Sequence, residues 1–282
     1  MGTIDFILNL AAVLLWLNWR SSKADPLVRR RPATLMGTLR PATAPAARRW
    51  RWLLLIPALL AGRAWVYWQF GASTIPVWAG KADFGIVVLS ISCHSTWAGF
   101  WRMMVFSGLS FSLMLGVFYL WLLLLSLLKG PDPIHGLVRV GLGRVDDWPT
   151  WAKVVVPWLV TAGGWLALTW LLAWQGIIPP PVSMAQRIEQ GVLIATGAFL
   201  VWKYLLGALF VLYLLNTYVY LGNSPFWKYV YLTAQKALGP LAQLPLRSGK
   251  MDFAPVAGTA LVFLAAEGMT RGLDWLFIRL PL

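Results

Sequence analysis

Residues 116–130 read GVFYLWLLLLSLLKG, and this apolar run extends back to about residue 103. An uninterrupted run of roughly 20 apolar residues is long enough to cross a bilayer as a helix. The rest of the 282-residue chain has the same character, because 59% of its residues are hydrophobic and only 12% are charged. A soluble domain carries about twice that charged share. The composition therefore indicates an integral membrane protein.

Seven apolar segments divide the chain, at 3–19, 52–70, 84–98, 103–128, 151–174, 191–221 and 253–278. A backbone in lipid must satisfy its own hydrogen bonds, and these runs are continuous rather than alternating, so we expect helices. The expected fold is all-α, a polytopic bundle of six or seven transmembrane helices with interfacial amphipathic helices between paired helices. Segment 84–98 leaves the number open, because it is short and its second half is polar. It is either re-entrant or fused with the next helix at 99–102.

The chain is strongly basic, with a formal net charge of +14. In a membrane protein, Lys and Arg hold loops in the cytoplasm and face anionic lipid, so we expect lipid partners and no nucleic acid. Segment 20–51 is either a topology signal or a clamp for lipid or a partner protein. The positive-inside rule places it in the cytoplasm, with the N-terminus outside. The expected headgroup contacts are Arg29, Arg30, Arg31, Arg48, Arg49, Arg51, Lys228 and Lys236.

The loops at 129–150 and 222–252 are also basic, and this creates a conflict in topology. Three apolar segments lie between 20–51 and 129–150, and three full crossings would place these loops on opposite faces. Either 84–98 does not span, or the acidic residues Asp132, Asp146 and Asp147 mark 129–150 as an outside loop. The first 20 residues lack a basic n-region and a small-residue cleavage site, so we interpret them as a retained anchor.

Two stretches, about 104–174 and 192–278, share one layout: apolar helix, proline, short amphipathic helix, proline, apolar helix. In the second stretch, helical spacing places Phe226, Val230, Thr233 and Ala237 on one side, and Lys228, Gln235 and Lys236 elsewhere. Such a segment is too short and too polar to span. We expect it to lie along the interface with its apolar face in the acyl boundary.

The second stretch also carries an ordered set of motif residues: Asn223, Pro225, Thr233, Pro240, Pro245, Arg247, Asp252 and Pro255. In this order and spacing they resemble the repeat of the YggT (YlmG) family, small membrane proteins of bacteria and plastids. Ser224 separates the family's Asn-Pro pair, and Ala234-Gln235 replaces its Glu-Pro. The resemblance covers 192–278 well and 104–174 only in layout. It implies a module at 1–100, a degenerate repeat at 101–175 and a second repeat at 191–282, in a bacterial plasma (inner) membrane.

The motif GKMDF at 249–253 opens the last apolar run, and GKADF at 80–84 repeats it. Asp252 is expected to cap the helix N-terminus, and Pro255 to fall in its first turn, where no N–H is needed. Gly249 permits a tight turn, and Lys250 can reach headgroups or Asp252. Asp83 is expected to cap a helix from residue 84 in the same way.

Polar residues inside apolar segments are candidates for function, here Lys203, Glu267, Arg271 and His94. Lys203 is either part of a pathway or headgroup site, or snorkels to an interface. Glu267 is expected to pair with Arg271 one turn on, as a surface pair rather than a proton relay. His94 is an alternative haem ligand. Cys93 beside it would point about 100° away on a helix, so we expect no metal site. His135 is expected to be solvated.

Enzyme motifs of the Walker, G-x-S-x-G and HExxH types are absent, so we predict a non-enzymatic protein without cofactors. The family resemblance implies an organiser of membranes or an assembly factor of a membrane complex, because members are linked to cytochrome maturation, membrane and nucleoid distribution, and osmotic stress. Small residues at Gly163–Gly164, Gly191, Gly197 and Gly207 permit close packing or a partner helix from another membrane protein. Two alternatives stay open: a small-solute or ion transporter or channel, and an accessory subunit of an electron-transfer complex.

Overall fold

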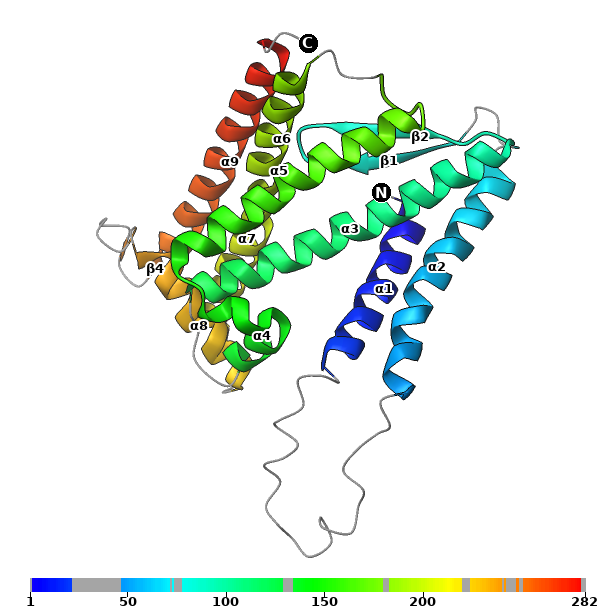
Figure 1. Ribbon diagram of the computed structural model, residues 1–282. Helices are drawn as coiled ribbons and strands as arrows, with labels where there is room; N and C mark the ends of the chain where they lie inside the picture. The colour runs from blue at the N-terminus through cyan, green and yellow to red at the C-terminus, as the bar shows by residue number, and fades with distance from the viewer. Residues whose placement is uncertain are drawn as a thin grey trace, which may run out of the picture. The chain divides into compact units, whose positions relative to one another are not determined.

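A computed structural model gives the architecture of the chain (Figure 1). It describes residues 2–21, 47–71, 73, 78–128, 134–179, 183–219, 224–239, 241, 247–248 and 251–279. Helices dominate these ranges, as the sequence predicts. The chain forms two compact units, Met1–Asp83 with Val88–Gly116 (unit 1), and Phe84–Val87 with Val117–Leu282 (unit 2).

Unit 1 is a set of apolar helices with a small sheet. Helix α1 (Thr3–Ser21) packs beside α2 (Ala47–Gly71), as Figure 1 shows in blue. Strands β1 (Ala79–Asp83) and β2 (Val88–Ser92) form an antiparallel hairpin. Helix α3 (Trp97–Leu128) begins in unit 1 and passes into unit 2 after Gly116.

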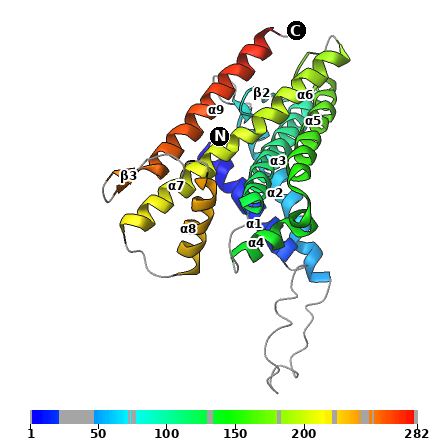
Figure 2. The same ribbon diagram turned by 90° about the vertical axis from the view of Figure 1, so that its left-hand side faces the viewer.

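Unit 2 continues with α4 (Ile134–Leu142), the 3₁₀ turn η2 (Gly143–Asp147), α5 (Thr150–Trp174) and α6 (Met184–Ala198). A second 3₁₀ turn, η3 (Phe199–Val201), joins α6 to α7 (Trp202–Tyr218). Then follow α8 (Pro225–Ala237), the two-residue strands β3 (Arg247–Ser248) and β4 (Met251–Asp252), and α9 (Ala254–Arg279). Helix α5 packs against α6, and α7 against both α8 and α9 (Figure 2).

Four helices in the described ranges are long and apolar enough to cross a membrane. They are Leu53–Gly71, Trp97–Leu128, Thr150–Trp174 and Met184–Tyr218, the last running through α6, η3 and α7. They correspond to predicted segments 52–70, 103–128, 151–174 and 191–221. Helices α1 and α9 match segments 3–19 and 253–278 in position but are not among the four. The chain has the character of a membrane protein, with four candidate spans rather than the six or seven predicted.

The prediction that 84–98 is a membrane helix is wrong. Residues 79–92 form a hairpin in which Ala79 pairs with Ser92 and Asp83 with Val88. Apolar and polar residues alternate along β2, where Leu89 and Ile91 are buried and Ser90 is exposed, and a period of two suits a strand. Gly85 turns the chain with a positive φ of 87°.

Two further expectations about this region change with the hairpin. Asp83 ends β1 and therefore caps no helix, contrary to the expectation from the GKADF motif. The alternative interpretation of 84–98, fusion with the next helix, is also wrong for most of the segment, because only Trp97 and Ala98 belong to α3. The polar second half of the segment, including Cys93 and His94, lies between β2 and α3.

Most of the small residues singled out in the sequence serve packing within the chain. A Cβ at Gly191 would lie 3.1 Å from the carbonyl oxygen of Ala162 in α5, and one at Gly207 would lie 2.8 Å from the Phe263 ring in α9. At Gly197, a Cβ would overlap the side chain of Ile86 in the hairpin turn, which belongs to unit 2. These glycines set the close approach of helices. Gly163 and Gly164 have open space beside them.

Candidate functional site

A buried group of charged side chains lies in unit 2 at the junction of α3, α4, η2 and α5. We call it the Asp146 cluster, and its members are Ser126, His135, Arg139, Asp146 and Lys153. Ser126 comes from the last turns of α3, and Lys153 from the first turn of α5. All members except Arg139 are buried, Lys153 almost completely.

Asp146 is the centre of this cluster. Its Oδ1 accepts a hydrogen bond from Ser126 Oγ, and its Oδ2 accepts one from Arg139 Nε at 3.2 Å. His135 Nε2 lies 3.4 Å from Oδ2, and Lys153 Nζ lies 4.0 Å from Oδ1. Lys153 Nζ in turn donates to Ser126 Oγ at 2.7 Å. One carboxylate thus joins side chains from three helices.

The surroundings of Asp146 favour its ionised form. Burial alone would raise the pKa of this carboxyl group. The hydrogen bonds from Ser126 and Arg139 and the charges of His135 and Lys153 outweigh burial, so the pKa of Asp146 lies below its ordinary value. A buried lysine needs a nearby counter-charge, and an ionised Asp146 supplies it.

The contact between Ser126 and Lys153 has the composition of a nucleophile with a general base. In such a pair the base must accept the hydroxyl proton. Here the hydrogen bonds run the other way, from Lys153 to Ser126 and from Ser126 to Asp146. Both side chains are also sealed from the surface. The geometry fits a structural ion network rather than a nucleophilic site.

A second buried polar group lies in unit 1, where α1, α2 and α3 meet. We call it the Arg63 cluster, and its members are Asp5, Asn9, Arg63, Tyr67, Ser107 and Ser110. Arg63 and Tyr67 lie inside the candidate span Leu53–Gly71, and the two serines inside Trp97–Leu128. The members come in pairs spaced three or four residues apart, which places each pair on one helix face.

The guanidinium of Arg63 reaches both neighbouring helices. Its Nη1 donates to Asn9 Oδ1 at 2.8 Å and lies 3.8 Å from Asp5 Oδ1. Its Nε donates to Ser107 Oγ at 2.9 Å, and its Nη2 to the Ser107 carbonyl at 2.6 Å. The planar fork of Arg suits this multiple recognition.

The remaining members of the Arg63 cluster are also hydrogen-bonded. Asn9 Nδ2 donates to Ser110 Oγ at 2.8 Å, and Tyr67 Oη donates to Asp5 Oδ1 at 2.7 Å. Ser107 Oγ donates to the carbonyl of Leu60 at 2.9 Å. Charges inside membrane helices face one another in this way because lipid offers them no partners. The cluster therefore fastens three helices to one another.

The predicted intramembrane residues belong to neither cluster. Lys203 is the second residue of α7, next to the 3₁₀ turn, and its Nζ lies 5.2 Å from the ring centre of Tyr204. Glu267 and Arg271 form the predicted pair, with Arg271 Nε donating to Glu267 Oε1 at 2.9 Å. This pair is on an exposed face of α9.

The two histidines and the cysteine lie in other surroundings than the sequence predicts. His94 is exposed in the loop after β2, with Nε2 3.3 Å from Ser92 Oγ, so its placement inside a membrane helix is wrong. Cys93 is buried, and burial raises the pKa of its thiol. His135, expected to be solvated, is buried against Asp146. Among the described residues, no three His, Cys, Asp or Glu side chains are grouped as metal ligands are.

The motif residues of the second repeat are placed only in part. Pro225 opens α8, and Pro255 lies in the first turn of α9, as predicted. Asp252 lies in β4, two residues before α9 begins, and Arg247 lies opposite it in β3; their side chains are outside the described part. Asn223, Pro240, Pro245, Gly249 and Lys250 also lie outside the described residues.

Helix α8 is amphipathic, as predicted, but its apolar face packs on protein. Val230, Thr233 and their neighbours Tyr229 and Ala234 are buried, whereas Phe226 is exposed. Ala234 and Leu238 pack with Phe210 and Tyr213 of α7. The face expected in the acyl boundary therefore rests against α7.

The predicted headgroup residues fall into three groups. Lys228 and Lys236 are exposed on α8. Arg48, Arg49 and Arg51 lie in the first turns of α2, but their side chains are outside the described part. Arg29, Arg30 and Arg31 lie outside the described residues.

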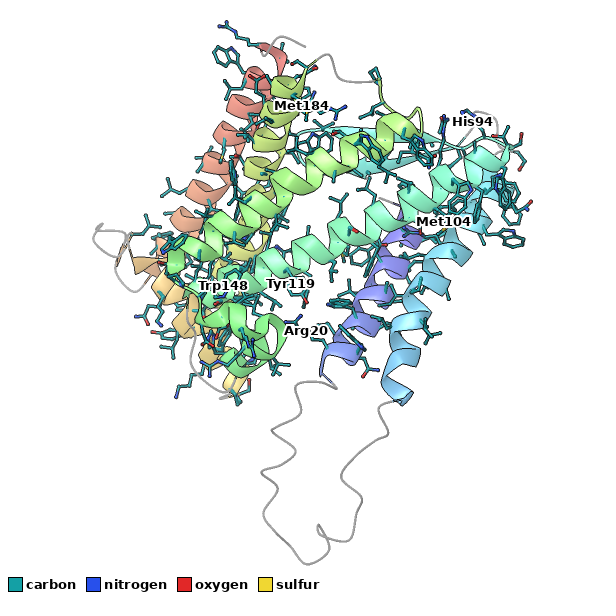
Figure 3. The ribbon with its side chains drawn as sticks, in the orientation of Figure 1. Arg20, His94, Met104, Tyr119, Trp148 and Met184 are labelled. Atoms are coloured by element: carbon teal, nitrogen blue, oxygen red, sulfur yellow. The ribbon has the colours of Figure 1, made fainter. Side chains whose placement is uncertain are left out.

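An aromatic group marks the end of unit 1 where α2 ends and α3 begins. The ring centres of Trp68 and Trp97 are 5.9 Å apart, and Trp97 stacks on Phe100 at 5.3 Å. Figure 3 shows His94 at this end of α3. Indole rings favour the membrane–water interface, so this end of unit 1 is a candidate membrane boundary.

Neither buried cluster is among the residues predicted from the sequence, although the sequence contains a signal for both. Asp5 with Asn9, Arg63 with Tyr67, and Ser107 with Ser110 are polar pairs at helical spacing inside apolar runs. Lys153 is likewise a lone cation at the start of an apolar run. Polar residues inside apolar segments are candidates for function, and this rule, which selected Lys203, also selects these positions.

Comparison with known proteins finds no match: no family model, no curated protein and no solved structure is similar to this chain. The resemblance to the YggT family thus depends on the motif residues alone.

Proposed function

We propose that this chain is a non-enzymatic, multi-pass protein of the bacterial plasma membrane, of the YggT type, that organises the membrane or assists assembly of a membrane complex. The observation that carries the proposal is a basic surface built by two short helices. It consists of the exposed cations of α4, η2 and α8, namely Arg139, Arg144, Lys228 and Lys236. We call it the basic platform.

The two helices of the basic platform pack against each other and against the longer helices. Helix α4 contacts α8. Val138 and Leu142 of α4 pack with Leu120 and Leu123 of α3, and α8 packs on α7. Apolar residues thus face the helices below while cations stay exposed. Basic groups on an interfacial helix attract anionic lipid headgroups, and this gives the platform its proposed ligand.

A count of crossings supports a cytoplasmic platform. With residues 79–92 in a hairpin, only α2 and α3 separate the basic start of α2 from α4, and only α5 and the α6–α7 rod separate α4 from α8. An even number of crossings returns the chain to the same face each time. The three basic regions then share one face, which the positive-inside rule assigns to the cytoplasm. The conflict between the basic loops disappears on this topology.

The buried clusters favour a scaffold over a transporter or channel. Transport sites offer charged or polar groups to a solute near the membrane centre. In this chain, Arg63 and Asp146 direct their hydrogen-bonding groups at neighbouring side chains within their own clusters. Networks of that kind hold helices in a fixed arrangement, which suits a protein that positions others.

The proposal can be tested by neutralising α8. Each basic side chain near an anionic surface contributes about 1 kcal/mol, so K228Q/K236Q should lower anionic-lipid affinity by about tenfold or more. Lipid binding is measured with purified protein in nanodiscs of zwitterionic lipid doped with phosphatidylglycerol. The control K81Q/R279Q removes two cations outside the platform and should change little.

The assembly role needs a test in the source cells. Removing the chain should lower the yield of at least one membrane complex on native gels, and wild-type protein should restore it. The K228Q/K236Q variant should restore less than K81Q/R279Q does. Unchanged complexes without the chain would refute the assembly role, and solute flux by the purified protein in proteoliposomes would favour the transporter instead.

A further inference from the structure

The α6–α7 rod, the longest candidate span in the described ranges, is not a continuous α-helix. The 3₁₀ turn η3 (Phe199–Val201) interrupts it near its middle, and none of the three residues of this turn is fully buried. A 3₁₀ turn winds more tightly than an α-helix and has poorer hydrogen-bond geometry, so a 3₁₀ stretch inside a long helix often marks a hinge. We therefore expect the rod to bend most easily at η3.

The helices of unit 2 form two groups that are joined by η3. In the α3–α6 group, the Asp146 cluster joins the end of α3 to α4, η2 and α5, and α5 packs along α6. In the α7–α9 group, α7 packs along both α8 and α9, as Figure 2 shows. Contacts between the two groups are much sparser, where α4 contacts α8 and α6 contacts α9. Sparse contacts lower the free energy that is needed to separate two parts of a fold.

Two tryptophan side chains hold η3 against α3. Trp121 Nε1 of α3 donates to the carbonyl oxygen of Val201 in η3 at 3.2 Å. Trp202 Nε1, at the start of α7, donates in the opposite direction to the carbonyl oxygen of Leu120 at 2.9 Å. Phe199 of η3 packs on the apolar cluster that Leu120 shares with α4. We call the two hydrogen bonds the tryptophan clasp. An indole has a single donor, so each ring gives its one polar group to this junction.

The basic platform has cations on both sides of η3. Arg139 and Arg144 belong to the α3–α6 group, whereas Lys228 and Lys236 belong to the α7–α9 group. Anionic headgroups that contact both sets bind best when the two groups are close together. A ligand that binds one arrangement better than another shifts the population toward that arrangement.

We propose that η3 is a hinge about which the α7–α9 group moves relative to the α3–α6 group, and that anionic lipid on the basic platform favours the closed arrangement. The structure shows the closed state, with both bonds of the tryptophan clasp formed. In the open state the clasp is broken and the two halves of the platform are apart, so closure and lipid binding support each other. The hinge depends on the geometry of unit 2 alone, whereas its control by lipid rests on the proposed function.

Distances between two spin labels measure the hinge in the purified full-length chain. In a Cys93→Ala background, labels at Leu137→Cys in α4 and Gln235→Cys in α8 form the between-group pair. Labels at Leu137→Cys and Ile188→Cys in α6 form the within-group pair. All three labelled positions are exposed, so the labels displace no buried side chain. In nanodiscs of zwitterionic lipid, each pair should give one main distance when the clasp is intact.

Removing the two indole donors should open the hinge. The variant W121F/W202F keeps an aromatic ring at both positions and removes both bonds of the clasp. The ratio of closed to open chains should fall by about five- to a hundredfold, as expected for two hydrogen bonds, and a second, longer between-group distance should appear. The within-group distance should stay the same. W158F removes an indole bond to Thr196 inside the α3–α6 group, and this matched control should change neither distance.

The outcomes separate the hinge from the platform. An unchanged between-group distance in W121F/W202F would overturn the hinge. Equal broadening of both pairs would overturn it too, because the clasp would then hold the whole of unit 2 together.

Phosphatidylglycerol in the nanodiscs should restore the closed distance of W121F/W202F, and adding K228Q/K236Q to this variant should prevent the restoration. A long distance that persists although the protein binds this lipid overturns the control by lipid. If the wild-type chain binds no anionic lipid, the platform and the control by lipid both fail, and the distances in zwitterionic lipid still decide the hinge.

Discussion

At the scale of single residues, the molecule has two buried charges at the centres of polar clusters: Arg63 inside an apolar helix and Asp146 in the 3₁₀ turn η2. Arg63 donates hydrogen bonds to Asn9 and Ser107, and Asp146 accepts hydrogen bonds from Ser126 and Arg139. A buried ion network adds little net stability compared with an apolar core of the same shape, but removing one partner leaves the other uncompensated. Replacing one partner alone should therefore destabilise the chain more than replacing both partners together.

Arg63→Ala tests this asymmetry. The variant removes the counter-charge of Asp5 and the donor to Asn9 Oδ1, and should lower the free energy of unfolding by about 3–5 kcal/mol. Arg144→Ala, an exposed arginine, should stay within about 0.5 kcal/mol of wild type. Unfolding is followed in detergent by tryptophan fluorescence. Adding Asp5→Asn to Arg63→Ala should recover part of the loss, and equal effects of the two arginine variants would contradict the assigned role.

The Asp146 cluster predicts a dependence of stability on pH. Because the pKa of Asp146 is lower in the folded chain than its ordinary value, the unfolded chain binds more protons on acidification. The stabilisation is complete above the ordinary carboxyl pKa and is lost as the pH falls through the lowered folded pKa. Asp146→Asn should be less stable at neutral pH and should lose less stability in acid. Parallel pH curves for the variant and wild type would show that this carboxyl group is not responsible.

At the scale of elements, the sequence predicts the helices well and the hairpin not at all. Continuous apolar runs define α2, α3, α5 and the α6–α7 rod, because a helix in lipid needs only its own backbone. Segment 84–98 is also apolar as a whole, and this apolar character predicts a helix. The alternation of apolar and polar residues at Leu89 and Ile91, which indicates a strand, extends over only a few residues and is easily missed. The partners within each cluster could not be assigned from the sequence, since Asn9 of α1 and Arg63 of α2, for example, are 54 positions apart.

Gly99 links the hairpin side of unit 1 to the first turn of α3. A Cβ at this position would lie 1.9 Å from the carbonyl oxygen of His94, a backbone atom that cannot rotate away. Gly99→Ala should therefore cost about 1–3 kcal/mol. Gly108→Ala in the same helix has open space and should be neutral or stabilising by up to about 1 kcal/mol. Thermal unfolding of the two variants in detergent makes the comparison, and a neutral Gly99→Ala would contradict the described loop.

At the scale of the whole molecule, the hairpin changes the membrane orientation that we expect for every helix after it. Were 84–98 a crossing, α4 and the start of α2 would lie on opposite faces, and one basic region would face outward against the positive-inside rule. As a hairpin, it leaves four candidate spans in the described residues, and on the proposed topology each basic region lies on the same face. The correction of one short segment therefore changes the sidedness that we propose for the later helices.

This sidedness can be measured with single cysteines and a membrane-impermeant maleimide, in a Cys93→Ala background. Lys81→Cys in β1 and Met184→Cys at the start of α6 should react in intact spheroplasts. Arg144→Cys in η2 and Lys228→Cys in α8 should react only after the membrane is opened. All four positions are exposed on the protein, so a difference in labelling reports the membrane face and not burial. Labelling of Lys81→Cys and Arg144→Cys from the same side would mean that α3 does not cross, and the cytoplasmic platform would then lose its basis.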